Sequence, residues 1–402
     1  MSPRSPGSAF RPMEGVRVVE FSTSIAGPLA TMILAQLGAD VVKVESPDGD
    51  DARGWPPHVG DRSIVYRNMS VGKRSVVIDL KHSQGVDVAL ALASSADVVL
   101  QSMRPGVVDR LGIGAAAVRE RNRDVIYYDM NAFGTGPIGR DMPGYDPMAQ
   151  AFTGIMEMTG HDGAPPTRCA PSIIDLGTGM WIAMGILAAV LARQRGQGVR
   201  SMETALVDTA FSMVCYQATT ALMSGERPPR AGSGNPIAAP YQCYEASDAP
   251  FMLAAGNQKI WMRVVQVLSA PELAEDARFT TGTLRSANRH ALEQELNARF
   301  AKSTADDWVA RLSAAGIPAT RVYGLEQAVV SEIARERRTF AESDGVPLVR
   351  LPWLVDGEPV AWSSPAPSLG QYTREVLREA GFSNERIDAL VASGAVREAS
   401  PR

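Results

Sequence analysis

The chain has 402 residues, of which 45% are hydrophobic and 21% charged, and its formal net charge is −4. This composition is typical of a globular protein with enough apolar residues for a large core, and the length allows two to three domains. It excludes intrinsic disorder and collagen-like order, and the small net charge argues against nucleic-acid binding through a strong basic field.

Histidine and cysteine are scarce. The three cysteines form no CxxC pair, and the four histidines form neither HxxxH nor HExxH. The cysteines therefore argue against a disulfide framework or a cysteine zinc site. A two-histidine helical metal site is excluded. Catalysis, if present, has to depend on carboxylates, hydroxyls or the backbone.

Two segments bear on localisation. Residues 1–12 are polar and rich in proline and serine, without the apolar stretch of a signal peptide, so they indicate a flexible tail. The apolar run 176–192 is long enough to be a borderline membrane span. Because nothing else in the chain favours a membrane, we expect a buried helix in a globular domain and a cytoplasmic protein.

The N-terminal half alternates strand and helix patterns. An apolar strand pattern at 16–21 precedes a helix pattern at 28–37, in which Pro28 fits the first helical position. The other strand patterns are at 41–45, 76–80, 98–101 and 125–129, with a helix pattern at 83–94. Such alternation predicts an α/β fold with a parallel sheet.

The C-terminal half predicts a smaller α/β unit after a linker. Residues 224–240 are rich in proline and glycine, as in a linker. Beyond it lie strand patterns at 251–255 and 317–322 and helix patterns at 260–268, 289–300 and 305–315. The segment 372–396 is helical in pattern with a break at Gly381.

Two glycine-containing turns in the sequence are candidate ligand sites. Residues 134–139 read GTGPIG, a literal GxGxxG, but Pro137, Pro143 and Gly144 leave no room for the helix that a dinucleotide site needs. We expect a Gly/Pro loop, which can still line a ligand site. The first strand–turn–helix, at 16–37, is either an ordinary connection or a place where backbone N–H groups meet a ligand.

Asp175 is the acidic residue of most interest. It lies in PSIIDLGTGMWIAMGILAAV, just before the uncharged helical run. One interpretation is a helix N-cap, and the other is an ionised nucleophile held by the helix dipole and free amides; the two are compatible. Gly177 and Gly179 are expected to leave space for a ligand.

The sequence resembles the family III CoA-transferases, which include formyl-CoA:oxalate and carnitine CoA-transferases and the α-methylacyl-CoA racemases. The resemblance begins with VVEFSTSIAGPLATMILAQLGADVVKVESPDGDDARGW. It continues in order through GKRSVVIDLK, SADVVLQSMRPGVVDRLG, GYDPMAQAFTG, IIDLGTGMWIAMGILAAVLARQRGQG and GIPATRV. These matches run from about residue 14 to the C-terminal region.

The resemblance implies the fold and the assembly. It implies a Rossmann-like large domain with a parallel sheet, built from both chain ends, a smaller α/β domain, and a homodimer whose protomers interlock. We therefore expect the large domain at 13–223 and 335–402, and the linker with the small domain at 224–334.

The resemblance also implies the chemistry. In the transferases an aspartate at the position of Asp175 attacks an acyl-CoA thioester and forms an aspartyl anhydride. The CoA thiolate then forms an aspartyl-CoA thioester and a free or retained acid. An acceptor carboxylate continues the exchange until a new acyl-CoA leaves. Acyl-CoA and small carboxylic acids are thus the expected partners, with no metal, no redox cofactor, no nucleic acid and no membrane.

CoA contacts are implied at nine positions by the same resemblance: Ile25, Ala26, Ile78, Lys81, Ser102, Met103, Arg104, Arg110 and Tyr145. Lys73, Arg74 and Lys81 form either a phosphate clamp or a solvated surface cluster. Tyr145 is either a neighbour of the catalytic carboxylate or a half-buried loop aromatic.

Departures from the family pattern separate its activities. The racemases place a histidine at Tyr145, and a tyrosine is a poor substitute for proton exchange because its reference pKa is near 10. Transferase is therefore favoured over racemase, and a non-catalytic CoA-binding protein is the third alternative. Ile25 replaces a glutamine of the formyl-CoA/oxalate enzyme and Ser46 replaces an arginine, whereas Trp55 is kept. Oxalate specificity is thus not implied.

Overall fold

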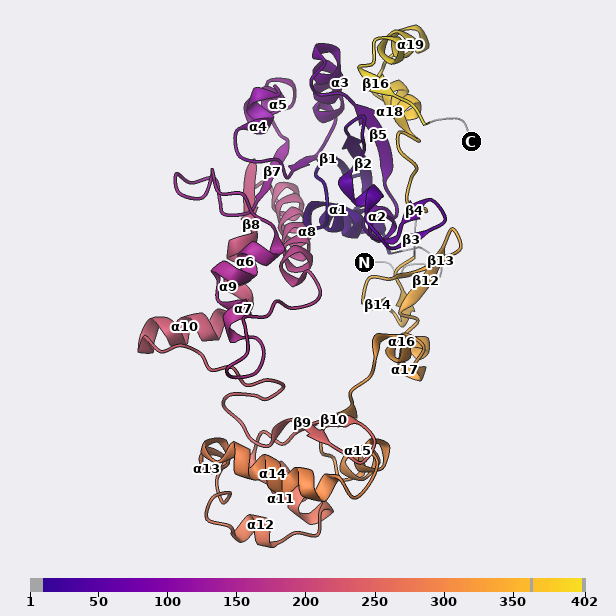
Figure 1. Ribbon diagram of the computed structural model, residues 1–402. Helices are drawn as coiled ribbons and strands as arrows, with labels where there is room; N and C mark the ends of the chain where they lie inside the picture. The colour runs from indigo at the N-terminus through magenta and orange to yellow at the C-terminus, as the bar shows by residue number, and fades with distance from the viewer. Residues whose placement is uncertain (1–9, 362–363, 400–402) are drawn as a thin grey trace. The chain divides into compact units, whose positions relative to one another are not determined.

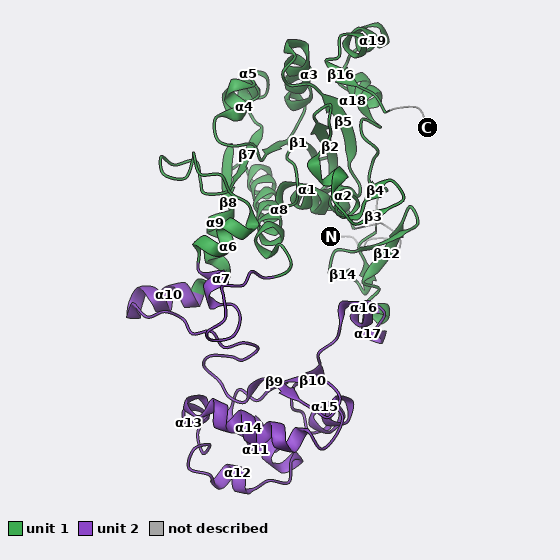
Figure 2. Ribbon diagram, in the orientation of Figure 1, with its two compact units in different colours: residues 1–153, 170–215, 335–402 green, residues 154–169, 216–334 purple. Residues whose placement is uncertain are grey.

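The computed structural model describes residues 10–361 and 364–399, so residues 1–9 of the expected tail lie outside the described residues. The chain divides into two compact units (Figure 2). Unit 1 takes its described residues from 1–153, 170–215 and 335–402, and unit 2 comprises 154–169 and 216–334. The sequence-based boundaries differ from this division chiefly at 154–169 and 216–223, which belong to unit 2.

A seven-stranded sheet forms the centre of unit 1 (Figure 1), with the order β16-β5-β2-β1-β6-β7-β8. Six strands are parallel, and β16 pairs antiparallel with β5 at one edge. The strands are β1 (Arg17–Phe21), β2 (Asp40–Glu45), β5 (Arg74–Ile78), β6 (Val98–Gln101), β7 (Ile126–Asn131), β8 (Ser201–Ala205) and β16 (Val396–Arg397). The parallel α/β fold is thereby confirmed, and the parallel strands have the Rossmann order 3-2-1-4-5-6.

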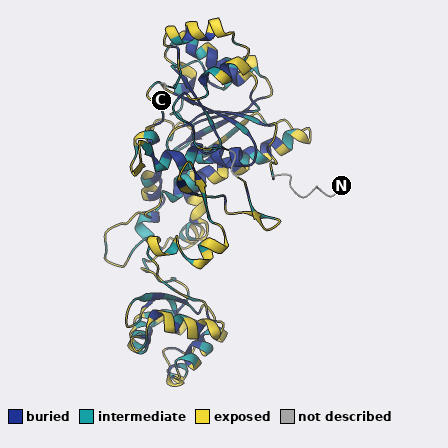
Figure 3. Cartoon of the chain, turned by 90° about the vertical axis from the view of Figure 1, so that its right-hand side faces the viewer, coloured by how far each residue is buried: buried dark blue, intermediate teal, exposed yellow. Residues whose placement is uncertain are grey.

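Helices cover both faces of this sheet. The valines of β1, β2 and β5 pack with α3, α5, α18 and α19 in one buried cluster. Helix α1 packs against α8 elsewhere in unit 1 (Figure 1). Figure 3 shows how far each part of the chain is buried. Continuous apolar runs in the strands fit burial on both faces. The helices are α1 (Ala26–Gln36), α2 (Ile64–Ser70), α3 (Ser83–Ser94), α4 (Val107–Arg110), α5 (Ala115–Arg121), α6 (Asp146–Phe152), α8 (Ile173–Gln194), α9 (Leu206–Met213), α18 (Thr373–Glu379) and α19 (Asn384–Ala392), with a 3₁₀ turn η1 (Asp51–Gly54).

Short hairpins complete unit 1, and their lengths explain why no periodic pattern revealed them. They are β3 (His58–Val59) with β4 (Arg62–Ser63), β12 (Phe340–Ser343) with β13 (Val346–Val349), and β14 (Leu354–Val355) with β15 (Glu358–Pro359).

Unit 2 has its own antiparallel sheet, β11-β10-β9, and its own core around Phe251, Trp261 and Phe300. Its strands are β9 (Tyr241–Glu245), β10 (Pro250–Ala254) and β11 (Ala319–Arg321). Its helices are α7 (Ile155–Met158), α11 (Gln258–Val267), α12 (Glu272–Glu275), α13 (Gly282–Ala287), α14 (Arg289–Phe300), α15 (Ala305–Ala314) and α16 (Leu325–Ala328), while α10 (Cys215–Ser224) and α17 (Glu332–Glu336) span the unit boundaries.

The apolar run of the sequence forms part of α8. Among the described residues, α8 is the one helix long and apolar enough to cross a membrane, and half of its most apolar window is buried in the chain. The buried half includes Gly177, Gly179 and Ile186, whereas Met180, Trp181 and Met184 are exposed. The helix expected to be buried is therefore buried on one face only.

Candidate active site

The point where the order of the parallel strands reverses lies between β1 and β6. The chain turns from β1 into α1 through residues 22–25, and the segment after β6 begins at Ser102. The backbone N–H of Thr23 donates to Ser102 Oγ at 3.2 Å, so the two strand ends are joined directly. In doubly wound sheets the carboxyl ends at this reversal form the ligand crevice.

A cavity of about 200 Å³ opens at this point. It brings together seven of the residues expected from the sequence, namely Ile25, Ala26, Ser102, Met103, Arg104, Tyr145 and Asp175. Trp55 also lines it, as do Pro143 and Gly144 of the loop after β7. That loop forms turns, and no helix begins before α6 at Asp146, so the rejection of a dinucleotide fingerprint at 134–139 is confirmed.

A second cavity, of about 390 Å³, shares Thr23 and Met103 with the first. It contains Ile78 and the exposed Lys81. Arg110 is exposed on α4 and lines neither cavity, so the structure does not bring it to the other candidate residues. Together the two cavities form an elongated site along the carboxyl edge of the sheet.

The prediction that Lys73, Arg74 and Lys81 form a phosphate clamp is wrong for Lys73 and Arg74. Lys73 is fully buried, and its Nζ donates to Glu20 Oε2 at 2.9 Å and to the Pro28 carbonyl at 2.8 Å. Arg74 forms ion pairs with Asp40 and Glu379. Both cations are thus engaged with the protein, and of the three only Lys81 lines a cavity.

Asp175 is the third residue of α8, one turn inside the position expected for an N-cap. Ser172 is the N-cap and makes no side-chain capping bond. Instead, the buried carboxylate of Asp146 accepts from the backbone N–H groups of Ile174, at 2.7 Å, and Asp175, at 3.2 Å. The helix amides that would stabilise an ionised Asp175 are therefore occupied by Asp146.

The electrostatics of Asp175 follow from this arrangement. Burial, together with the nearby Asp146 carboxylate, raises the pKa of Asp175 from its ordinary 3.8 to about 7. The sequence-based expectation of a carboxylate held ionised by the helix N-terminus is therefore wrong. A poorly solvated carboxylate of high pKa is more basic than a surface aspartate once ionised, and such a group is suited to act as a nucleophile.

The glycines beside Asp175 serve helix packing, not ligand access as expected. A Cβ on Gly177 would overlap the side chain of Met213, and one on Gly179 would lie 2.8 Å from the carbonyl oxygen of Ala26. The close approach of α8 to the start of α1 therefore requires a residue without a side chain at Gly179. This contact sets the separation between the Asp175 helix and the turn that carries Ile25.

The start of α1 contributes backbone donors to the cavity. The helix begins at Ala26, two residues earlier than expected, so Pro28 is its third residue. Its N-cap, Ile25, makes no side-chain hydrogen bond to the first turn. The helix N-terminus therefore presents a partial positive charge at the cavity that contains Asp175.

The sequence analysis missed one residue that supports the site, Asp146. Asp146 lies in the segment GYDPMAQAFTG, where an Asp-Pro pair before an apolar helix was the available signal.

Among the described residues no cluster of three or more His, Cys, Asp or Glu could hold a metal ion. Unit 2 contains a larger cavity, of about 770 Å³, but none of the residues expected from the sequence lines it.

Comparison with known proteins gives consistent matches along the chain. The family model for CoA-transferase family III matches residues 13–373. The acetyl-CoA:oxalate CoA-transferase of Acetobacter aceti is 34% identical over 365 residues, which cover 89% of this chain and 92% of the relative. The succinyl-CoA:glutarate CoA-transferase of Mus musculus is 30% identical, with 98% of this chain and 93% of the relative covered.

Solved structures give the same result for the fold. A CAIB/BAIF family protein from Brucella suis superimposes with a TM-score of 0.82 at 32% identity, covering 92% of this chain and 99% of that structure. The Rv3272 protein of Mycobacterium tuberculosis superimposes with a TM-score of 0.83 at 30% identity, covering 92% of this chain and all of that structure.

Proposed function

Because the chain belongs to CoA-transferase family III and is thus an acyl-CoA:carboxylate CoA-transferase, we propose that Asp175 carries the acyl group and then CoA as covalent intermediates. The observation that supports this role best is the position of Asp175, whose desolvated carboxyl of raised pKa lines the cavity at the strand-order reversal.

The proposed reaction cycle consists of four acyl transfers, after which the Asp175 carboxylate is free again. The Asp175 carboxylate attacks the donor thioester carbonyl, and the tetrahedral intermediate then expels CoA as a thiolate and leaves a mixed aspartyl anhydride. The thiolate attacks the Asp175 carbonyl, which gives an aspartyl-CoA thioester and releases the donor acid. The acceptor carboxylate attacks this thioester, giving a second anhydride and CoA thiolate. The thiolate finally attacks the acceptor's carbonyl, so the new acyl-CoA leaves and the Asp175 carboxylate is regenerated.

The surroundings of Asp175 favour this relay. Each step develops negative charge on an oxygen or a sulfur, and the first turn of α1 provides positive potential at the same cavity. The relay requires that water be kept from the activated anhydride and thioester, which hydrolysis would otherwise consume. In this proposal the pantetheine arm passes Ile25, Ala26 and Met103, and Lys81 binds near the adenosine end in the second cavity.

Chemical trapping tests the proposal. Incubation with an acyl-CoA and hydroxylamine converts an acylated Asp175 to a hydroxamate, which mass spectrometry of the Asp175 peptide detects. Asp175→Asn, and wild-type protein without acyl-CoA, are the matched controls and are expected to remain unmodified. Absence of the hydroxamate under conditions where CoA binds would overturn the mechanism. Deuterium exchange at the α-carbon without an acceptor acid would instead favour a racemase.

The acceptor acid is proposed to be a small carboxylic acid. The relatives are named for oxalate, glutarate and, in Haloarcula marismortui, mesaconate. A cavity of about 200 Å³ beside Asp175 suits an acid of that size. A screen of acyl-CoA donors against such acids, with product CoA esters identified by mass, tests this, and exclusive use of long-chain acids would contradict it.

We also propose a homodimer in the cytoplasm. The exposed face of α8 carries Met180, Trp181, Met184 and Leu191, and an apolar face of this kind is typical of a surface that another protein covers. A second copy of this chain is the proposed occupant. Light scattering coupled to size exclusion should give twice the chain mass, and Trp181→Glu should reduce it to one chain. A wild-type monomer at micromolar concentration would contradict the proposal.

A further inference from the structure

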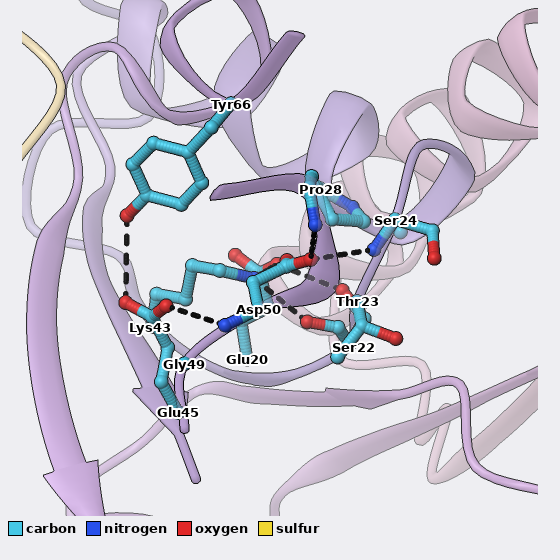
Figure 4. Close-up of polar contacts among 12 residues, drawn as sticks. Glu20, Ser22, Thr23, Ser24, Pro28, Lys43, Glu45, Gly49, Asp50 and Tyr66 are labelled. Carbon is cyan, nitrogen blue, oxygen red and sulfur yellow. Dashed lines mark hydrogen bonds and ion pairs between the residues drawn. The ribbon is translucent and has the colours of Figure 1, made fainter. Parts of the chain in front are cut away.

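A fully buried ionic cluster lies beneath the turn between β1 and α1 (Figure 4). Glu20 on β1 accepts from two lysines, Lys43 Nζ at 3.0 Å through Oε1 and Lys73 Nζ at 2.9 Å through Oε2. Lys43 Nζ also lies 2.8 Å from Asp50 Oδ2. The charges of the two buried lysines are balanced by the two buried carboxylates, Glu20 and Asp50. The cluster uses two of the five lysines in the chain.

The cluster is joined to the backbone of the turn. Lys43 Nζ donates to the Ser22 carbonyl at 2.7 Å, so its three N–H donors reach Glu20, Asp50 and this carbonyl. Asp50 Oδ1 accepts from the backbone N–H of Ser24 at 3.0 Å, as Figure 4 shows. The turn is therefore tied on both sides of Thr23 by one ion pair.

Ser24 is the strained residue of this turn. Its φ is +72°, a left-handed conformation that residues with a side chain adopt only at a cost. Ser24 is followed directly by Ile25 and Ala26, and all three line the cavity that contains Asp175. A change in the φ of Ser24 would redirect the backbone that leads into Ile25 and Ala26, and would thereby alter the packing of Ala26 against Gly179 on the Asp175 helix.

We propose that Asp50, oriented by Lys43, is a positioning residue that holds Ser24 left-handed and thereby fixes the α1 start against Asp175 for acyl transfer. The inference rests on the transferase function proposed above. Asp50 lines the second cavity but not the Asp175 cavity, and its Oδ1 also accepts from the Ala52 N–H at the start of η1. Its influence on Asp175 therefore passes through the backbone of the turn and of η1, and only the path through Ser24 is relieved by a glycine at position 24. Because Lys43 and Asp50 are both buried, salt screens their ion pair only weakly.

A variant set separates positioning from stability. Asp50→Ala removes the acceptor of the Ser24 N–H and is expected to lower kcat by about tenfold or more, since small misplacements at a reacting centre have effects of this size. Adding Ser24→Gly should recover most of that loss, because glycine adopts positive φ without a Cβ penalty. The lost thermal stability should not return, because Lys43 still lacks one of its two carboxylate partners.

Two further variants complete the test. Asp50→Asn keeps an oxygen that can accept from the Ser24 N–H, so it should retain kcat better than Asp50→Ala while it loses stability. Tyr66→Phe is the matched control, since Tyr66 is buried beside Glu45 and does not contact the turn. It should lower the melting temperature without changing kcat. If Asp50→Ala does not fold, Ser24→Val, which disfavours positive φ and leaves the ion pairs intact, should lower kcat relative to Ser24→Gly.

The outcomes distinguish this inference from the proposed function. Wild-type protein that forms no Asp175 hydroxamate overturns the transferase mechanism itself. Wild-type protein that forms it, with an Asp50→Ala variant equally fast, overturns the positioning role alone. The role is also overturned if Ser24→Gly restores nothing, or if Asp50→Asn and Asp50→Ala lose kcat equally. A crystal structure of Asp50→Ala should show Ser24 outside the left-handed region.

Discussion

Replacing Asp175 by asparagine should stabilise the folded protein at neutral pH. The pKa of this carboxyl rises from 3.8 to about 7 because of burial and the Asp146 charge. Between these values the folded chain keeps a proton that the unfolded chain has lost. The folded state therefore binds more protons, and wild-type stability falls as pH rises from about 4 to about 7.

The magnitude follows from the size of the shift. A difference of about 3 pKa units corresponds to about 4 kcal/mol at 1.36 kcal/mol per unit. Asp175 is partly exposed, so solvent screening reduces the expected value to about 2 kcal/mol. Asp175→Asn removes the titrating group and with it this penalty, which is fully present above pH 7 and absent below pH 4.

Urea denaturation at a series of pH values measures the effect. The stability advantage of Asp175→Asn over wild type should grow from pH 4.5 to pH 7.5 and remain constant above. Asp61→Asn is the control, because the Asp61 side chain is 96% exposed, and it should show no such growth. An advantage of Asp175→Asn that is the same at every pH would refute the reasoning that Asp175 is protonated in the folded protein below pH 7.

Three further predictions concern residues around the site. Asp146→Asn removes the like charge beside Asp175, so the pH midpoint of Asp175 hydroxamate formation should move to lower pH; an unchanged midpoint would contradict the coupling. Gly179→Ala should destabilise the protein by about 1–3 kcal/mol in urea denaturation, because its Cβ would lie 2.8 Å from an α1 carbonyl; wild-type stability would contradict the packing argument. Lys73→Met leaves Glu20 with one cation and should lower the free energy of unfolding by about 3–5 kcal/mol in urea denaturation. A higher KM for acyl-CoA with unchanged stability would indicate a phosphate-binding lysine and would contradict this prediction.

Local patterns in the sequence predicted the elements that depend on local physics. The helix pattern at 83–94 coincides with α3 and that at 289–300 with α14, since amphipathic spacing requires no distant partner. The break at Gly381, which has φ +88°, separates α18 from α19. Strand β8, with its partly exposed SMETA sequence, and the two-residue β16 escaped notice, because each becomes a strand only by pairing with β7 or β5.

The candidate residues that the family resemblance implied line a cavity chiefly where they directly follow a strand. Ile25 and Ala26 follow β1, and Ser102, Met103 and Arg104 follow β6, so the parallel sheet alone brings them to one edge. Arg110 sits one helix further along, on α4, and lines neither cavity. A position directly after a strand therefore indicated which candidate residues line a cavity. Closeness in sequence to other candidate residues, as for Arg110, did not.

The sequence by itself determined the α/β alternation, the resemblance to family III CoA-transferases and the choice of Asp175. Only the tertiary structure decided the electrostatics. Lys73 pairs with Glu20 from 53 positions away, and Asp146 occupies amides of α8 from 29 positions away. The charge state of a carboxyl or an ammonium depends on its partners and on the loss of water around it, and folding alone establishes both.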